Sequence, residues 1–290
     1  MIAGKGMFVH KLKDIGEPEI AASNAFDAGF THVLIKILDG VWKYNQRTYY
    51  VNNVLKFADD LIEPYVKAFH DKGIEVHGWQ WIYHASWSPA ITEARVAKER
   101  VAQFGLDAFG IDAEASVKDM GVVSQTYANE LKGIGVPVFL STYRYPSLHR
   151  EINYKAYLSA CDYVSPQVYW ASATNAGAQL LRAMGEWAGM TDLPIIPTGA
   201  AYSEHGWTAQ PGEVVEFLQT AKDEGLKGAN FWVWNHAKKL GLWDYISKFP
   251  WSVAKPPEVP PSVFPDSVGV KIDVAGTKYW GQADMMGQGS

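Results

Sequence analysis

The chain has few of the features that tie proteins to disulfides, nucleic acids or membranes. Its single cysteine, Cys161, cannot form an internal disulfide, and no Cys/His cluster has the spacing of a zinc site. The net charge of -5 and the lack of any Lys/Arg block argue against a surface that binds nucleic acid or anionic lipid. No apolar run approaches the roughly 20 residues of a membrane span. We therefore expect no metal, no cofactor, and neither a nucleic acid nor a membrane as partner.

Two common catalytic signatures are missing as well. No glycine-rich phosphate-binding fingerprint follows the first predicted strand, which disfavours a dinucleotide-binding sheet. Segment 140–143, LSTY, lacks the flanking glycines of a G-x-S-x-G elbow, which disfavours an α/β-hydrolase. Segment 1–14 has no long apolar region followed by a cleavage site, so no signal peptide is predicted.

Aromatic residues, by contrast, are abundant. The sequence holds 12 Trp and 15 Tyr in 290 residues. Much of this aromatic content is expected in the core, because each large ring can bury roughly 150–250 Å². Rings that remain exposed in a cleft are the usual platforms for sugars, whose axial C–H faces stack on them.

Short β-branched or aromatic runs alternate with helical patterns along most of the chain. Strands are predicted at 6–12, 31–40, 75–83, 108–116, 137–145, 163–170, 194–202 and 228–237. Helices are predicted at 18–29, 58–72, 89–105, from 117 to 131, and at 154–160, 176–187, 212–225 and 240–248. Eight strand–helix units in about 250 residues predict an α/β fold, a single (β/α)8 TIM barrel over residues 1–251, in preference to an open doubly wound sheet.

The composition changes after this predicted barrel. Residues 252–265 are Pro-rich and are predicted to form a semi-rigid linker. Residues 266–290 resemble the start of a small β-module or a tail. A further C-terminal module or a larger assembly is therefore possible.

Asp112 and Glu114 are the most informative pair of residues. They lie two positions apart in the fourth predicted strand, so their side chains share one face with Gly110. Two like charges in a core are costly unless something uses them, and the ends of barrel strands are where active sites lie. One carboxylate can stay ionised while its charge raises the pKa of the other, which then serves as an acid. The alternative is a structural ion pair with Lys36 or Arg144.

The same strand carries a resemblance to a known family. Residues 107–114, DAFGIDAE, resemble the DxxDxDxE signature of family 18 glycoside hydrolases, the chitinases and endo-β-N-acetylglucosaminidases. Asp107, Asp112 and Glu114 match the signature, whereas Gly110 stands in place of its second Asp. Segment 165–170, SPQVYW, is similar to the sixth strand of that family, and segment 228–235, GANFWVWN, is similar to the eighth.

The resemblance implies a substrate-assisted retaining mechanism. Glu114 would be the general acid/base, and Asp112 would orient the acetamido group of the substrate, which acts as the internal nucleophile. Tyr169 would hold that group, and Trp234 or Trp232 would form the floor of the sugar site. Gly110 removes a partner that would tune Asp112.

A second resemblance is to family 25 lysozymes, which also carry an Asp-x-Glu pair on the fourth strand of a barrel. Their first strand usually presents an Asp, where this chain has no acid before Asp14. A phage-type wall hydrolase would suit a barrel followed by a linker and a β-module. We therefore expect extracellular or phage-associated action.

Further residues are expected to bind substrate. The predicted binding set comprises Trp234, Trp232, Gln167, Tyr143, Asn235, Trp42, Lys36 and His10. Gln167 shares the face of Tyr169, only one of Tyr143 and Arg144 can point inward by alternation, and Asn235 ends the eighth predicted strand. Trp42 lies in a long loop as a cleft-wall aromatic. His10 and Lys36 are expected to face the interior with Gln80, and Trp79 and Trp81 to pack under helices.

The function predicted first is hydrolysis of a β-linked N-acetylhexosamine-containing glycan, such as peptidoglycan or a chitin-like polymer, with Glu114 as the acid. The alternative is a non-catalytic or weakly catalytic barrel that binds glycan, for example the wall-binding part of a phage or surface assembly. A metal-dependent enzyme using Asp112, Glu114 and Asp39 is disfavoured, because no histidine clearly joins them at a strand end.

Overall fold

The computed structural model describes residues 3–251, 270–274 and 277–281, which belong to two compact units, Met1–Pro257 and Glu258–Ser290. The predicted Pro-rich linker at 252–265 lies outside the described residues. In the second unit, strands β14 (Val270–Val274) and β15 (Thr277–Gly281) pair antiparallel. The predicted 266–290 module is described only at these two strands.

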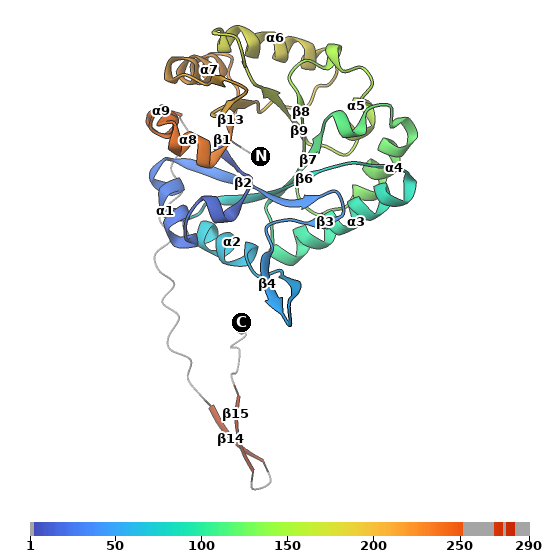
Figure 1. Ribbon diagram of the computed structural model, residues 1–290, viewed down its shortest axis with the longest axis vertical. Helices are drawn as coiled ribbons and strands as arrows, with labels where there is room; N and C mark the ends of the chain where they lie inside the picture. The colour runs from blue at the N-terminus through green and yellow to red at the C-terminus, as the bar shows by residue number, and fades with distance from the viewer. Residues whose placement is uncertain (1–2, 252–269, 275–276, 282–290) are drawn as a thin grey trace, which may run out of the picture. The chain divides into compact units, whose positions relative to one another are not determined.

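The first unit is a closed parallel barrel. Its strands, in spatial order, are β1 (Gly4–Val9), β2 (Phe30–Asp39), β6 (Glu75–Trp81), β7 (Ala108–Ala113), β8 (Val138–Tyr143), β9 (Tyr163–Val168), β10 (Thr198–Ala200) and β13 (Gly228–Trp232). β1 pairs with both β2 and β13, which closes the ring. The predicted (β/α)8 barrel is thus confirmed (Figure 1).

Helices surround the barrel on its outside (Figure 1). They are α1 (Pro18–Asp27), α2 (Ile62–Asp71), α3 (Trp87–Phe104), α4 (Gly121–Leu131), α5 (Tyr154–Leu158), α6 (Ala176–Ala188), α7 (Pro211–Asp223), α8 (Trp234–Lys239) and α9 (Leu242–Lys248). Short 3-10 turns lie at η1 (Leu12–Asp14), η2 (Ala115–Val117) and η3 (Pro146–Leu148). Pro18 and Pro211 occupy first turns, where a missing N–H costs nothing, and Gly105 ends α3 in the left-handed region at φ 59. None of the described helices is long and apolar enough to cross a membrane.

The barrel interior is filled by side chains and is therefore a core, not a channel. Its apolar cluster comprises Phe8, Leu34, Trp79, Ala108, Phe139, Tyr163, Ile196 and Val233. Two polar pairs lie in the same interior: His32 Nε2 with Asn230 Oδ1 at 2.7 Å, and Ser165 Oγ with Thr198 Oγ1 at 2.9 Å. This packing gives any site at the strand ends a solid base.

Trp79 and Gln80 point in directions opposite to those expected. Trp79 lies in the barrel interior and Trp81 at its mouth, whereas Gln80 faces the helices, where it donates to the carbonyls of Gly40 and Glu93. Strand alternation requires this opposition. The predicted orientation of Trp79 and Trp81 is wrong, because an aromatic pair is as suited to the inside of a barrel as to its outer layer.

Two segments differ from the predicted elements. The loop after β2 holds strand β3 (Trp42–Lys43), which pairs with β2, and a separate hairpin of β4 (Arg47–Val51) and β5 (Val54–Ala58). The eighth strand ends at Trp232, and the chain continues as α8, where a strand to residue 237 was predicted. Basic residues in the last turn of α8 suit its C-terminal dipole.

Candidate active site

A cavity of about 570 Å³ opens at the carboxyl ends of the strands. It is lined by Phe8, Trp81, Asp112, Glu114, Ser141, Tyr143, Arg144, Tyr145, Leu148, His149, Gln167, Tyr169, Tyr202, Glu204 and Trp232. These residues come from six barrel strands, β1, β6, β7, β8, β9 and β13, and from the segments that follow β7, β8, β9 and β10. The cavity therefore lies where the fold class places catalytic groups.

Asp112, Glu114 and Gln167 form the polar centre of this cavity. The Gln167 Nε2 amide donates to Asp112 Oδ1 at 2.9 Å, to Glu114 Oε1 at 2.8 Å and to Ser141 Oγ at 3.2 Å. The strand registers pair Asp112 with Ser141, and Tyr143 with Gln167, which brings these side chains together. Because one nitrogen reaches both carboxylates, their bonded oxygens lie at most about 6 Å apart.

Burial shifts the acidity of both carboxyl groups. Asp112 is only 6% exposed, and its burial, together with the charge of Glu114, raises its pKa well above the ordinary value, while the Lys36 cation opposes the rise. Burial also raises the pKa of Glu114, although the hydrogen bond from Gln167 works against it. A pair of this kind holds a proton at pH values where free carboxylates have lost theirs.

Tyrosines form one wall of the cavity. Tyr169 follows the end of β9, and its ring meets Tyr202 edge-on at 5.3 Å. Burial and the nearby charges of Glu114 and Asp112 raise the pKa of Tyr169 well above its usual value, so its phenol stays neutral and can donate. Tyr143, which also lines the cavity, stacks on His149 with ring centroids 3.6 Å apart.

Of the two tryptophans proposed for the floor, Trp232 lies in the cavity and Trp234 does not. Trp232 packs on Phe8 and Trp79, with ring centroids 5.6 Å apart in both pairs. Trp234 is 2% exposed, begins α8 and packs on Trp243 at 4.5 Å. The assignment of Trp234 is wrong because the strand ends two residues before it.

His10 and Asn235 line an adjoining cavity of about 300 Å³, which shares Trp232, Tyr202 and Glu204 with the larger one. Asn235 lies on α8 and does not end a strand. Burial and the Lys36 charge lower the pKa of His10 to about 4, so its ring is neutral, and it pairs with Tyr44 Oη at 3.1 Å.

Lys36 and Trp42 are not among the described residues that line either cavity. Lys36 Nζ lies 3.3 Å from Asp39 Oδ1 and 4.5 Å from the centre of the Tyr44 ring, beneath the mouth. Its effect on the site is electrostatic, through Asp112. Trp42 is 74% exposed on β3.

Asp107, the first residue of the acidic motif, lies away from the cavity. Its Oδ2 accepts from the backbone N–H of Val76 and contacts His70 Nε2, both at 2.7 Å. It therefore joins the beginnings of β6 and β7. Gly110 lies in the interior, where a Cβ would come within 2.3 Å of the Phe139 ring, so Phe139 occupies the space of the missing carboxylate.

Several lining residues were not predicted as site residues. Trp81 and Ser141 share their strand faces with Trp79 and Tyr143, so alternation alone could have found them. Arg144 lines the cavity as well as Tyr143, although only one was expected to, because β8 ends at Tyr143 and alternation ends with it. The Arg144 guanidinium donates to the carbonyl of Tyr169. Tyr202 ends the strand predicted at 194–202, but β10 ends at Ala200, so Tyr202 lies in the loop that follows it.

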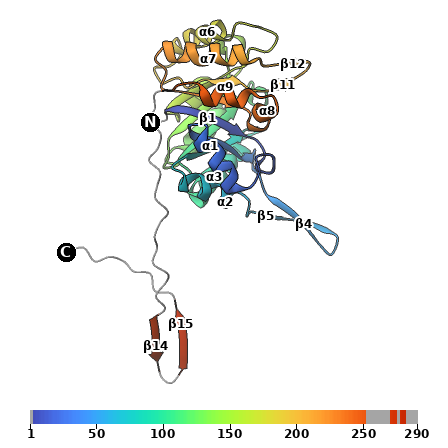
Figure 2. The same ribbon diagram turned by 90° about the vertical axis from the view of Figure 1, so that its left-hand side faces the viewer.

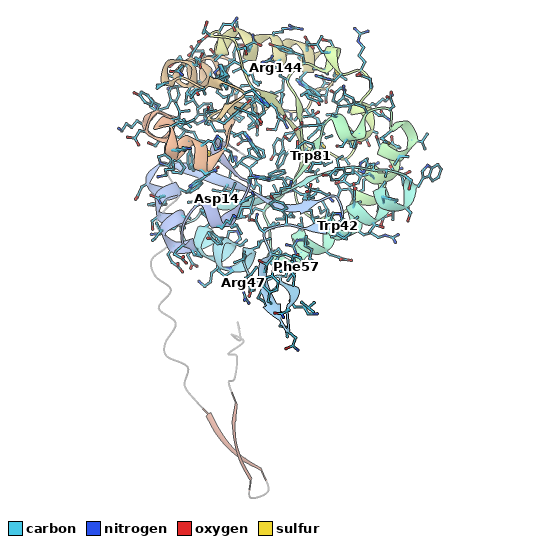
Figure 3. The ribbon with its side chains drawn as sticks, in the orientation of Figure 1. Asp14, Trp42, Arg47, Phe57, Trp81 and Arg144 are labelled. Carbon is cyan, nitrogen blue, oxygen red and sulfur yellow. The ribbon has the colours of Figure 1, made fainter. Side chains whose placement is uncertain are left out.

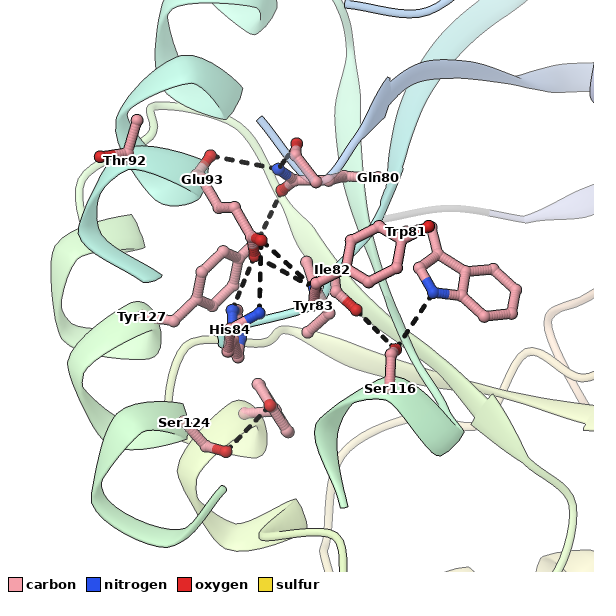
Figure 4. Close-up of polar contacts among 12 residues, drawn as sticks. Gln80, Trp81, Ile82, Tyr83, His84, Thr92, Glu93, Ser116, Ser124 and Tyr127 are labelled. Atoms are coloured by element: carbon pink, nitrogen blue, oxygen red, sulfur yellow. Dashed lines mark hydrogen bonds and ion pairs between the residues drawn. The ribbon is translucent and has the colours of Figure 1, made fainter. Parts of the chain in front are cut away.

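A polar network fixes Trp81 at the mouth (Figure 4). The indole N–H of Trp81 donates to Ser116 Oγ at 3.1 Å, and the Ser116 hydroxyl donates to the carbonyl of Ile82 at 2.7 Å. Behind it, the carboxylate of Glu93 accepts from the backbone N–H groups of Tyr83 and His84 and pairs with His84 Nδ1 at 2.7 Å. The loop after β6 is thus tied both to α3 and to the turn that follows Glu114.

No group of three or more His, Cys, Asp or Glu side chains in the described part of the chain is placed to hold a metal ion. Asp39, considered above as a ligand, bonds with Lys36 and with the Tyr83 hydroxyl, which lies 3.2 Å from its Oδ1.

No protein-family model matches the sequence, and no curated protein matches it either. Solved structures do match over the barrel. A family 18 N-acetylglucosaminidase from Paenibacillus barengoltzii has 11% identity and a TM-score of 0.54, with 85% of this chain and 99% of that chain covered. A chitinase from Rhizomucor miehei has 11% identity and a TM-score of 0.59, covering 84% and 98%. The spore cortex-lytic enzyme of Bacillus cereus has 10% identity and a TM-score of 0.56, covering 84% and 73%.

The chain shares the fold of these enzymes. The family 18 resemblance drawn from three strand ends therefore agrees with the whole barrel. At these identities the likeness concerns the fold, and the activity must be argued from the cavity.

Proposed function

We propose that this chain is a glycoside hydrolase that cleaves β-linked N-acetylhexosamine-containing glycan, with Glu114 as the general acid. The observation that carries the proposal is the carboxylate pair bridged by Gln167 in an aromatic cavity at the strand ends. Cleavage of a glycosidic bond needs a carboxyl group that can still give up a proton to the leaving oxygen, and burial raises the pKa of Glu114 in the direction that such an acid requires.

The proposed mechanism is retaining, because the acetamido group of the substrate takes the place of a nucleophilic carboxylate and water enters in a second step. Asp112 and Glu114, both bonded by Gln167, are close enough to act on one sugar residue. In the proposed first step, the carbonyl oxygen of the substrate acetamido group attacks the anomeric carbon while the glycosidic C–O bond breaks. The leaving oxygen takes the proton of Glu114.

In the second step, the Glu114 carboxylate takes a proton from water, whose oxygen attacks the anomeric carbon and restores the acetamido group. Asp112 orients the acetamido group from below, and the neutral phenol of Tyr169 donates to it. Trp232 forms the floor under the sugar ring. The roles of Asp112 and Tyr169 rest on the resemblance to family 18, and their positions around the cavity are consistent with them.

Relatives of the same fold support two substrate classes. Neighbouring structures include a Cycas revoluta chitinase with bound (GlcNAc)4, at 8% identity and a TM-score of 0.59, covering 84% of this chain and 99% of that chain. The Bacillus cereus relative is a spore cortex-lytic enzyme. Chitin-like glycan and peptidoglycan both contain the acetamido group that the mechanism needs, so both are candidates.

The test is release of reducing ends from chitooligosaccharides and from purified peptidoglycan. We expect the wild type to cleave at least one of them, and Glu114→Gln to reduce kcat by at least about 100-fold, the usual contribution of a general acid. Glu204→Gln is the matched control, a carboxylate of the same cavity with no place in the mechanism, and should retain activity within about tenfold of the wild type. Equal activity in the wild type and Glu114→Gln would contradict the assignment.

The second candidate function is a barrel that binds glycan with little or no cleavage. Gly110 favours it, because the Phe139 ring fills the place of the motif carboxylate next to Asp112. Binding of both glycans without any release of reducing ends would support this candidate over the first.

A further inference from the structure

The hairpin of β4 and β5 exposes apolar side chains on both faces. Tyr50 is 72% exposed and Phe57 58% exposed, and Val51, Val54 and Leu55 are exposed beside them. Among the strands that the structure describes, β4 and β5 pair only with each other. A two-stranded ribbon is marginal on its own in water, and clustered exposed apolar groups mark a binding surface.

This hairpin is nevertheless built with defined geometry. Its turn is made by Asn52 and Asn53, both with positive φ, 50 and 61, which matches the tight turn that joins twisted strands. At its base, Arg47 donates to both carboxylate oxygens of Asp60. Asp59 pairs with Lys43 at 3.0 Å and with Arg100. These ion pairs fix the base from which the apolar part projects (Figure 2).

One face of the hairpin is an aromatic platform. The register pairs Tyr50 with Leu55 and Thr48 with Phe57. Directly opposed residues point to the same side, and alternate positions along each strand do too, so Tyr50, Leu55 and Phe57 share a face. The two rings are diagonal neighbours across the strands, close enough to contact one ligand together.

Aromatic side chains continue from the cavity towards this platform. Trp81 lines the cavity and is in register with Asp39, which in turn is in register with Trp42. Tyr83, exposed, donates its hydroxyl to the same Asp39. Figure 3 labels Trp81, Trp42 and Phe57. The β4–β5 hairpin also projects on the same side of the barrel as the β11–β12 hairpin (Ser203–Glu204 and Trp207–Thr208), which carries Glu204 of the cavity (Figure 2).

We propose that Tyr50 and Phe57, with Trp42, form a second glycan-binding surface that holds the strand of a polymeric substrate beyond the cavity. The inference rests on the proposed function and adds to it that the substrate is a long chain, not a short soluble oligosaccharide. Sugar rings stack their C–H faces on exposed aromatic rings, and the asparagines of the turn supply amides for the hydroxyl groups. Continuity with the cavity through Trp81 and Asp39 selects a glycan as the occupant.

The test separates docking from cleavage. Binding to insoluble chitin particles and to purified peptidoglycan sacculi is measured by co-sedimentation in a Glu114→Gln background, where nothing is cleaved. The double variant Tyr50→Ala/Phe57→Ala should bind with a Kd at least about tenfold higher, which corresponds to a loss of about 1.4 kcal/mol of binding free energy. With active Glu114, the double variant should lose polymer hydrolysis to a similar degree but cleave soluble chitotetraose at the wild-type rate. Tyr245→Ala, an exposed tyrosine on α9, is the matched control and should change neither.

Three results would overturn the proposal. Unchanged polymer binding in the double variant would remove the docking role. Equal losses on polymer and on chitotetraose would show that the hairpin acts through the cavity. A dimer in sedimentation velocity that the double variant abolishes would make a second copy the occupant. If the wild type neither binds nor cleaves any glycan, the proposed function itself fails. That outcome differs from a wild type that is active and whose polymer binding is unchanged by the hairpin substitutions, which contradicts the further inference alone.

Discussion

At the scale of single residues, the charge state of Asp112 governs the site. Its pKa is raised by burial and by Glu114, so the folded protein binds a proton there more tightly than the unfolded chain does. The stability that comes from this proton is fully present below the unfolded pKa and is lost as pH rises through the folded pKa. The wild type should therefore lose stability between mildly acidic and alkaline pH.

The Asp112→Asn variant should lack this loss. We expect the melting temperature of the variant minus that of the wild type to increase from pH 4 to pH 8. The wild type alone loses the stability that comes from the raised pKa, and each unit of that shift is worth about 1.4 kcal/mol. Thermal melts at the two pH values measure it, with the exposed Asp27→Asn as the control. A difference that stays constant with pH would contradict the buried-proton account.

Ser116 is expected to position Trp81. Ser116→Ala removes the acceptor of the indole N–H and the donor to Ile82, so Trp81 loses its fixed orientation. The variant should raise KM for glycan several-fold with kcat little changed, and should cost about 1 kcal/mol of stability. Ser116→Thr, which keeps the hydroxyl, should restore KM, whereas an unrestored KM would indicate a purely structural role.

The candidate site could be predicted from the sequence only where strands keep their alternation. Asp112, Glu114 and Gln167 lie on strands or directly at their ends, and spacing of two was enough to place them on one face. Arg144 and Tyr202 lie beyond strand ends, where the backbone direction depends on loops that no local pattern specifies.

At the scale of elements, the loop between β6 and α3 depends on one buried carboxylate. Glu93 accepts from two backbone N–H groups of the loop and pairs with the buried ring of His84, whose neighbours are Tyr127 and Tyr157. Replacing a carboxylate oxygen by an amide nitrogen removes an acceptor and leaves a buried donor without a hydrogen bond.

Glu93→Gln should therefore lower the free energy of unfolding by about 1–3 kcal/mol, the cost of leaving a buried donor unsatisfied. The half-exposed Glu130, which pairs with Arg95, is the control, and Glu130→Gln should cost less than about 1 kcal/mol. Urea unfolding curves of both variants measure the difference. Similar losses in the two would mean that the Glu93 network does not hold the loop.

The β4–β5 hairpin and helix α8 were not predicted, for different reasons. The β4–β5 hairpin is stabilised by ion pairs between its base and Asp59, Asp60 and Arg100, contacts that bring together distant residues. Helix α8 was predicted as strand because its aromatic start continues the β-like run of β13, and the burial of Trp234 against Trp243 decides otherwise.

At the scale of the whole molecule, the barrel could be predicted because its evidence is repeated eight times, so an error in any one unit leaves the total intact. The direction of the Trp79 side chain could not be predicted, because both faces of a barrel strand are buried and an apolar run does not distinguish them. Placement of the cavity followed from the fold class, whereas its shape depends on loops.

The most direct test of substrate-assisted retention is the configuration of the product at the moment it forms. Fresh hydrolysis of chitotetraose is followed by proton NMR before the new reducing end can mutarotate. Attack by the substrate acetamido group followed by attack of water inverts the anomeric carbon twice, which predicts that the β-anomer appears first and the α-anomer grows in later. An α-anomer formed first would mean that a water attacks directly, and it would contradict the mechanism built on this pair.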